Sequence, residues 1–162
     1  MFVKGSENKL GVLGIGKKQL IEDWLKEYHF KKYELRPDFS IDVIGHVNLY
    51  LREDKLPEFI QFNRIFGSFV CSNGKLTTLK GFPYEIDSYF GCHNNKLSSF
   101  DFFPKCIGSN CFIHKNPIVD PLKETEIRDY LRSKSKIKGQ IDVISRDYIS
   151  LKNNGQNLYN SI

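Results

Sequence analysis

Apolar and polar positions recur along the middle of the chain with a period of 21 residues. Three segments align without gaps, and each begins at an isoleucine: Ile65, Ile86 and Ile107. Two apolar columns follow within the segments: Phe69, Phe90 and Cys111, then Cys71, Cys92 and Ile113. A fixed period of this length is the signature of a solenoid, in which each repeat forms one coil and stacks on its neighbours. The pattern therefore predicts that these columns lie on adjoining strands.

The spacing inside each repeat predicts a short strand followed by a turn. Phe69 and Cys71 are two positions apart, so their side chains point to the same side of a strand, toward the interior. A divergent earlier unit, one residue shorter, fits the same columns with Leu49, Leu51, Asp54, Leu56 and Phe59. The strand must then turn inside the protein, and its backbone groups need partners. Because Asn bonds both N–H and C=O groups, Asn95 and Asn116 are predicted to form a ladder, in which Asp54 takes part and Gly74 cannot.

The repeat units FVCSNGKLTTLKGFP and FGCHNNKLSSFDFFP resemble the leucine-rich-repeat proteins of bacteria and tailed phages, whose units read F-x-C-S-N-N-x-L-T-S-L-x-G-x-P. The resemblance covers about Trp24 to Ile118. It departs from the pattern at Gly74, at Phe100 and at Asp101–Phe102. It implies an α+β fold, a short leucine-rich-repeat solenoid with parallel strands on its concave face. It also implies a binding scaffold without enzymatic activity, and for a phage protein a host target.

The flanking segments are predicted to close the ends of the solenoid, because a few repeats cannot seal their own core. Apolar residues at helical spacing predict a helix from Lys17 to His29, and Asp120 and Pro121 mark the start of a second helix that ends near Ser133. The tetrapeptide Ile-Asp-Val-Ile occurs at 41–44 and again at 141–144. It is either a duplicated helix–strand cap or a coincidence of strand-forming residues. The predicted organisation is a flexible lead-in (1–16), an N-terminal helix and cap (17–43), repeats (44–119), a C-terminal helix and strand-like cap (120–151) and a tail (152–162).

Residues that alternate with the inward columns should form stripes on the concave face. These stripes comprise Asn48, Ser68, Tyr89 and Asn110; Tyr50, Val70, Gly91 and Phe112; and Arg52, Ser72, His93 and His114. Aromatic residues beside Arg and small polar groups are typical of protein-binding surfaces. We therefore expect this face to bind a partner protein. The alternative is that a short solenoid simply exposes some aromatic residues.

Charge and cysteine content leave one further partner class open. The formal net charge is +5, and the densest basic cluster is RSKSKIK at 132–138. This cluster is interpreted as a solvated helix end, with nucleic-acid binding as the alternative function. The sequence contains no apolar run of membrane-spanning length and no signal-type N-terminus, so a cytoplasmic protein is expected, in the host cytoplasm if it is phage-encoded. The four cysteines are expected to be reduced, with Cys71 and Cys92 as small apolar core residues.

Three candidate chemical sites each lack a required group, so neither catalysis nor a cofactor is expected. The stretch from Gly11 to Lys18 nearly matches a phosphate-binding loop, but Lys18 stands where a hydroxyl must hold magnesium. Stacked His93 and His114 could bind a metal, but their column supplies no carboxylate or thiolate. Cys106 has no assignable base.

Overall fold

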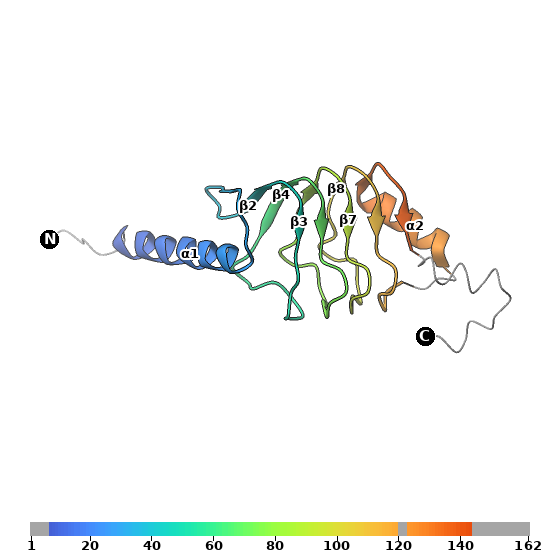
Figure 1. The fold of residues 1–162 in the computed structure, drawn as a ribbon, viewed down its shortest axis with the longest axis horizontal. Coiled ribbons are helices and arrows are strands. Elements are labelled where there is room, and N and C mark those ends of the chain that lie inside the picture. The colour runs from blue at the N-terminus through green and yellow to red at the C-terminus, as the bar shows by residue number, and fades with distance from the viewer. Residues whose placement is uncertain (1–6, 120–122, 144–162) are drawn as a thin grey trace.

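Each coil of the chain contributes two short parallel strands, one to each of two sheets (Figure 1). The structure is a computed structural model that describes residues 7–119 and 123–143. The six-stranded sheet has the order β1 (Tyr33–Leu35), β2 (Ile41–Ile44), β4 (Phe62–Phe66), β6 (Glu85–Ile86), β8 (Cys106–Ile107) and β10 (Lys136–Ile137). The five-stranded sheet has the order β11 (Ile141–Asp142), β9 (Cys111–Phe112), β7 (Phe90–Gly91), β5 (Phe69–Val70) and β3 (Val47–Asn48). All pairings are parallel except that of β1 with β2.

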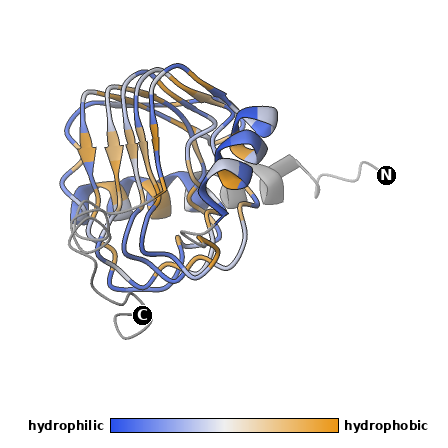
Figure 2. Cartoon of the chain, turned by 90° about the vertical axis from the view of Figure 1, so that its right-hand side faces the viewer, coloured by the Kyte–Doolittle hydropathy of each residue, from blue (hydrophilic) through white to orange (hydrophobic). Residues whose placement is uncertain are grey.

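The predicted apolar column lies on adjoining strands, as the 21-residue period requires. Phe69 pairs with Phe90, and Phe90 with Cys111, and all three side chains are fully buried. Seen from the end of the solenoid in Figure 2, hydrophobic stretches recur at the same place in successive coils. The Phe69 ring also meets Phe62 and Phe82 edge-on, with centroids 5.5 and 5.3 Å apart, a geometry that aromatic pairs favour. The chain is thus a solenoid with one continuous aromatic and aliphatic interior.

A second sheet was not predicted. The isoleucines that begin the repeats pair in register, Ile65 with Ile86 and Ile86 with Ile107, and are buried on strands of the six-stranded sheet. In β6 and β8 the isoleucine is the single buried residue, and in β4 the two buried residues, Phe62 and Ile65, are three positions apart, so no alternating run marks these strands in the sequence.

The first coil has a different register from the predicted one. Val47, not Leu49, pairs with Phe69, and Asn48 pairs with Val70. Val47, Leu49 and Leu51 are all apolar at a spacing of two, so the pattern alone fits either register, and a shift of two residues keeps the same side chains facing inward.

The N-terminal helix α1 spans Glu7–Glu27, so it begins ten residues before the predicted Lys17 and occupies much of the predicted flexible lead-in. The glycine-rich stretch from Gly11 to Lys18 is therefore helical. Extending an existing helix by further turns costs less than nucleating one, which lets the glycines be included. Ile21, Trp24 and Leu25 are buried in the core, and the Trp24 ring lies 6.3 Å from that of Phe62.

The C-terminal segment continues both sheets instead of standing apart from the repeats. Helix α2 (Glu124–Lys134) buries Leu131, and the strands after it, β10 and β11, pair in parallel with β8 and β9. The predicted start at Asp120 and Pro121 and the predicted tail lie outside the described residues. The two Ile-Asp-Val-Ile copies are not equivalent, because Ile41 belongs to the six-stranded sheet and Ile141 to the five-stranded one. The two copies therefore do not occupy equivalent positions in the fold.

Within the described ranges, neither helix is both long and apolar enough to cross a lipid bilayer.

Candidate functional site

The outer face of the six-stranded sheet carries alternating charges that pair with one another. One column across its strands consists of Asp42, Arg64, Glu85, Cys106 and Lys136. The Arg64 guanidinium lies 2.9 Å from Asp87 and 3.6 Å from Glu85. Arg36 reaches Asp42 at 3.1 Å, and Asn63 donates to the same carboxylate at 2.7 Å. Asp42, Arg64 and Glu85 are thus paired within the chain.

The outer face of the five-stranded sheet is nearly free of charge. The register places its outward residues in three columns: His46, Ser68, Tyr89, Asn110 and Gln140; Asn48, Val70, Gly91, Phe112 and Asp142; and Tyr50, Ser72, His93 and His114. Asp142 is the one carboxylate among these positions, and they include no Lys or Arg. We call this set the neutral face.

Aromatic side chains are the most prominent features of the neutral face. Tyr50 is 71% exposed and Tyr89 41% exposed, and the rings of Tyr89 and Phe112 meet edge-on at 6.0 Å. Val70 and Phe112 are partly buried beside them. A preformed aromatic pair of this kind offers a partner apolar area that is already fixed in place, which reduces the entropy lost on binding.

A histidine pair forms the third column. Ser72 Oγ and His93 Nδ1 are 2.9 Å apart, and the rings of His93 and His114 stack at 4.6 Å with 19° between their planes. Burial lowers the pKa of both imidazoles, and the nearby Lys115 lowers it further; at His114 the neighbouring His93 also contributes to the lower pKa. The pair is therefore held in the neutral form at neutral pH.

The predicted stripes are brought together on this face, with corrections at the first coil. Because of the shifted register, Asn48 lies in the column of Val70 and Tyr50 in that of Ser72, where Arg52 was expected. Arg52 is exposed outside the columns. Ser68 is only 1% exposed, because it lies in the tight corner between the two sheets, and it offers a partner almost no surface.

The buried asparagines bond the turns of neighbouring coils. Asn95 Oδ1 accepts from Leu76 N at 3.1 Å, and its Nδ2 donates to Cys71 O and Cys92 O at 2.8 and 3.0 Å. Asn116 repeats this pattern one coil further on, with Leu97 N, Cys92 O and Ile113 O. The predicted bonding is thus present at both asparagines.

The first two positions of the predicted ladder behave differently. The prediction for Asp54 is wrong: its side chain is exposed, and its backbone oxygen accepts from Thr77 N at 2.8 Å. The register shift moves it out of the Asn column. At Gly74 a Cβ would come within 2.8 Å of Asn95 Oδ1, so the missing side chain leaves room for the Asn95 amide.

The four cysteines are free thiols. Cys71, Cys92 and Cys111 are buried in the core, and burial raises the pKa of each thiol, that of Cys71 to about 12. A thiol that stays protonated is a poor nucleophile, so these residues act as packing groups.

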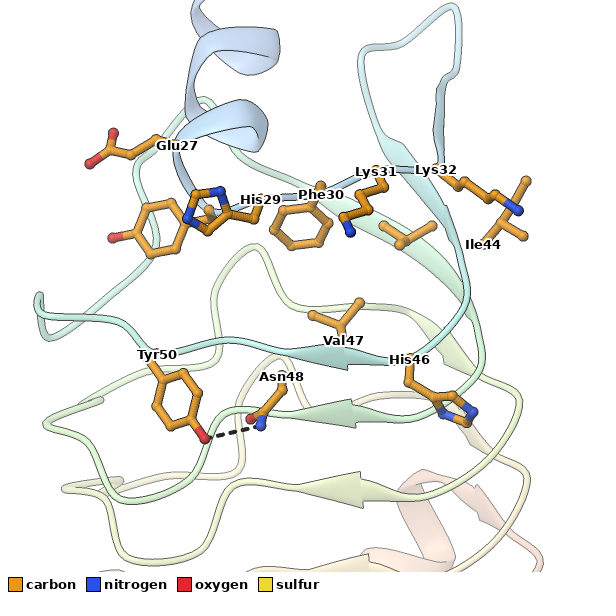
Figure 3. A pocket seen from close by; sticks show the side chains of 12 residues that line it. Glu27, His29, Phe30, Lys31, Lys32, Ile44, His46, Val47, Asn48 and Tyr50 are labelled. Carbon is orange, nitrogen blue, oxygen red and sulfur yellow. Dashed lines mark hydrogen bonds between the residues drawn. The ribbon is translucent and has the colours of Figure 1, made fainter.

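A cavity of about 630 Å³ adjoins the neutral face at the open end of the first coil (Figure 3). One wall is the segment Glu27–Lys32, and the other is the chain from Val43 to Tyr50, including β3. Ile44 N donates to Lys32 O at 2.9 Å at one end, and Tyr28 Oη donates to Glu53 Oε2 at 3.3 Å at the other. We call this cavity the slot. Sequence reasoning missed it, because no local pattern shows which segment will lie opposite β3.

In the described part of the chain, no group of three or more His, Cys, Asp or Glu side chains is placed to hold a metal ion. The fold and the neutral face define a parallel β-solenoid with one charge-depleted outer surface. Comparison of the chain with protein-family models, curated proteins and solved structures finds no match.

Proposed function

We propose that the chain is a non-enzymatic scaffold that binds a partner protein through the neutral face. The observation that carries this proposal is the contrast between the two sheets: one pairs its charges internally, and the other presents Tyr50, Tyr89 and Phe112 with a single carboxylate among its columns. The centres of protein interfaces are depleted of charge and enriched in aromatic residues. Tyrosine is also among the residue types that most often dominate binding energy.

The finer classification is also part of the proposal. The 21-residue units and the bonded Asn95 and Asn116 support a leucine-rich-repeat type, with α1 and α2 as caps that cover the two ends of the core. The resemblance of the repeat units to those of tailed phages supports a host protein as the target, bound in the host cytoplasm.

Substituting the three aromatic residues tests the neutral face. The triple variant Tyr50→Ser, Tyr89→Ser and Phe112→Ser should reduce partner binding at least 100-fold, because hot-spot residues contribute about 2 kcal/mol or more each. The matched control is the triple variant Arg64→Ser, Glu85→Ser and Lys136→Ser on the other sheet, which should bind within threefold of the native chain. Binding is measured by biolayer interferometry with the partner recovered from a lysate by the native chain.

Circular dichroism melts of both variants separate lost binding from lost folding. A neutral-face variant that stays folded and keeps its affinity, or a control variant that loses it, contradicts the proposed site.

Nucleic-acid binding through the basic cluster remains the alternative function. Much of the cluster is engaged within the chain: Arg132 donates to Ile137 O and Gly139 O, each at 3.1 Å, and Lys134 lies over the Tyr130 ring. A salt titration distinguishes the two functions, since phosphate contacts give a steep loss of affinity with salt and neutral aromatic contacts do not.

A further inference from the structure

The free edge of β3 lacks the neighbour that every later strand of its sheet has. Further along the sheet, Ser68 O and Val70 O accept from Val47 N and Leu49 N, each at 2.8 Å. Their counterparts on the first coil are His46 O and Asn48 O, which face the slot together with Asn48 N, because alternate residues of a strand direct their backbone groups to opposite sides. Within residues 7–119 and 123–143, no hydrogen bond reaches these three groups.

The slot separates this edge from the segment that lies opposite. Glu27–Lys32 takes the position of a preceding coil, and in the described part of the chain its hydrogen bonds to the first coil lie at the two ends described above. Between those ends, Phe30 and Val47 point toward each other from opposite walls (Figure 3). The Phe30 ring is held by Trp24 and Phe62, at 6.0 and 5.7 Å, so this wall is fixed.

Charge is distributed unevenly along the slot. Lys31 and Lys32 lie at the His46 end of β3, and Glu27 lies at the Tyr50 end (Figure 3). All three are exposed. A strand that enters parallel to β3, as all its other neighbours do, places its N-terminal half beside the lysines and its C-terminal half beside the glutamate.

We propose that the slot binds an extended, acidic peptide segment of a partner protein, which adds to the five-stranded sheet as a parallel strand beside β3. Its backbone pairs with His46 O, Asn48 N and Asn48 O, since main-chain pairing supplies the affinity in strand addition. A carboxylate in its N-terminal half pairs with Lys31 and Lys32, and an apolar residue at its centre lies between Phe30 and Val47. The inference rests on the proposed function, and it specifies the chemistry of the partner at the end of the neutral face where Tyr50 lines both surfaces.

The test begins with a yeast-displayed library of random eight-residue peptides, selected on the full chain. Enriched peptides should carry Asp or Glu in the N-terminal half and an apolar residue at the centre. The affinity of one synthetic enriched peptide is then measured by fluorescence anisotropy, beside a copy that is N-methylated at alternate amides. One of the two methylation registers should weaken binding at least tenfold, because it removes the donors to His46 O and Asn48 O.

Variants of the chain test the edge and the charge separately. Asn48→Pro removes one edge donor and leaves the bonds from β3 to β5 in place, because Asn48 N points away from β5. It should reduce affinity at least tenfold, and at least threefold more than Asn48→Ala, which removes the same side chain and keeps the N–H. Lys31→Glu with Lys32→Glu should cost at least tenfold, whereas the matched charge change Lys75→Glu with Lys96→Glu should not. If Asn48→Pro fails to fold, the methylated peptides still decide the role of the edge.

Several results would overturn the proposal. The first is a selection that enriches no acidic extended peptide. The second is a peptide affinity that neither methylation register nor Asn48→Pro changes. The third is a concentration-dependent dimer of the chain that Asn48→Pro disrupts, which would assign the slot to a second copy. Peptides that lose affinity with Tyr89→Ser and Phe112→Ser, but not with Asn48→Pro, would also overturn it while leaving the neutral face as the binding surface. The opposite result is also informative. If acidic peptides bind the slot as described but substitutions on the neutral face leave partner binding unchanged, only the proposed function is refuted.

Discussion

The two sheets of this solenoid share one core and differ in what they present to solvent. Across the six-stranded sheet, charges of opposite sign follow one another in register, and Arg64 contacts both Glu85 and Asp87. Across the five-stranded sheet, neighbouring coils present tyrosine, phenylalanine, histidine and small residues. Like charges directly opposite on neighbouring strands destabilise a sheet, so stacked charges must alternate in sign or be avoided. The first sheet uses alternation, and the second uses neutral side chains.

The difference has a functional consequence. When a second protein covers a surface of paired charges, the ions must be desolvated, and their mutual attraction offsets that cost only in part. A neutral aromatic surface has no such cost and gains from apolar burial. This difference in desolvation cost is why we propose the five-stranded sheet as the binding surface.

The largest effect on stability is expected at the buried ladder beside the neutral face. Asn95→Ala leaves Cys71 O and Leu76 N without their side-chain partner, whereas Cys92 O keeps its bond to Asn116. With about 1–3 kcal/mol for each buried group left unsatisfied, the free energy of unfolding should fall by about 3 kcal/mol. Urea unfolding followed by circular dichroism measures the change.

Arg64→Ala on the charged sheet provides the comparison. Its ion pairs are more than a third exposed, so the loss should be below about 1 kcal/mol and should shrink further with added salt. If Arg64→Ala lowered the free energy of unfolding more than Asn95→Ala does, the surface ion pairs would contribute more to stability than the buried asparagine bonds, which would contradict this expectation.

A smaller effect should appear as a dependence of stability on pH. The pKa values of His93 and His114 are lower in the folded chain than the ordinary 6.5, chiefly because of burial. The unfolded chain therefore binds protons more readily than the folded chain. The stability that the two neutral rings contribute is fully present above pH 6.5, and it is lost as the pH falls through that value toward the folded pKa values. Lys115 opposes protonation of both rings, and Asp142 favours protonation of His114.

Thermal melts between pH 7.5 and 5 test this sign. The native chain should become less stable as the pH falls, and His93→Gln with His114→Gln should flatten the slope. A native chain that gains stability on acidification through this pair would show that the rings are not held neutral.

The two sheets also differ in how well the sequence predicts them. In β5, β7 and β9 of the five-stranded sheet, the inward residue at the start of the strand is followed by a second one two positions later, as Phe69 is by Cys71. This alternation repeats every 21 residues, so the register of these three strands could be predicted. Strands β4, β6 and β8 of the six-stranded sheet carry one isoleucine each and gave no comparable signal. Asp54 was assigned wrongly because the apolar residues Val47, Leu49 and Leu51 permit two registers. The slot depends on the position of Glu27–Lys32 relative to β3, a tertiary contact that no local pattern encodes.

Hydroxyl-radical footprinting of the native chain, free and bound to the partner it captures, tests the central claim most directly. Aromatic side chains report their own exposure in this measurement, and exposed aromatic residues lie on the neutral face and also outside it. We expect oxidation of Tyr50, Tyr89 and Phe112 to fall on binding, while that of Phe66 and Tyr84, which are exposed outside the neutral face, stays unchanged. Protection of Phe66 and Tyr84 with no change at Tyr89 and Phe112 would contradict it.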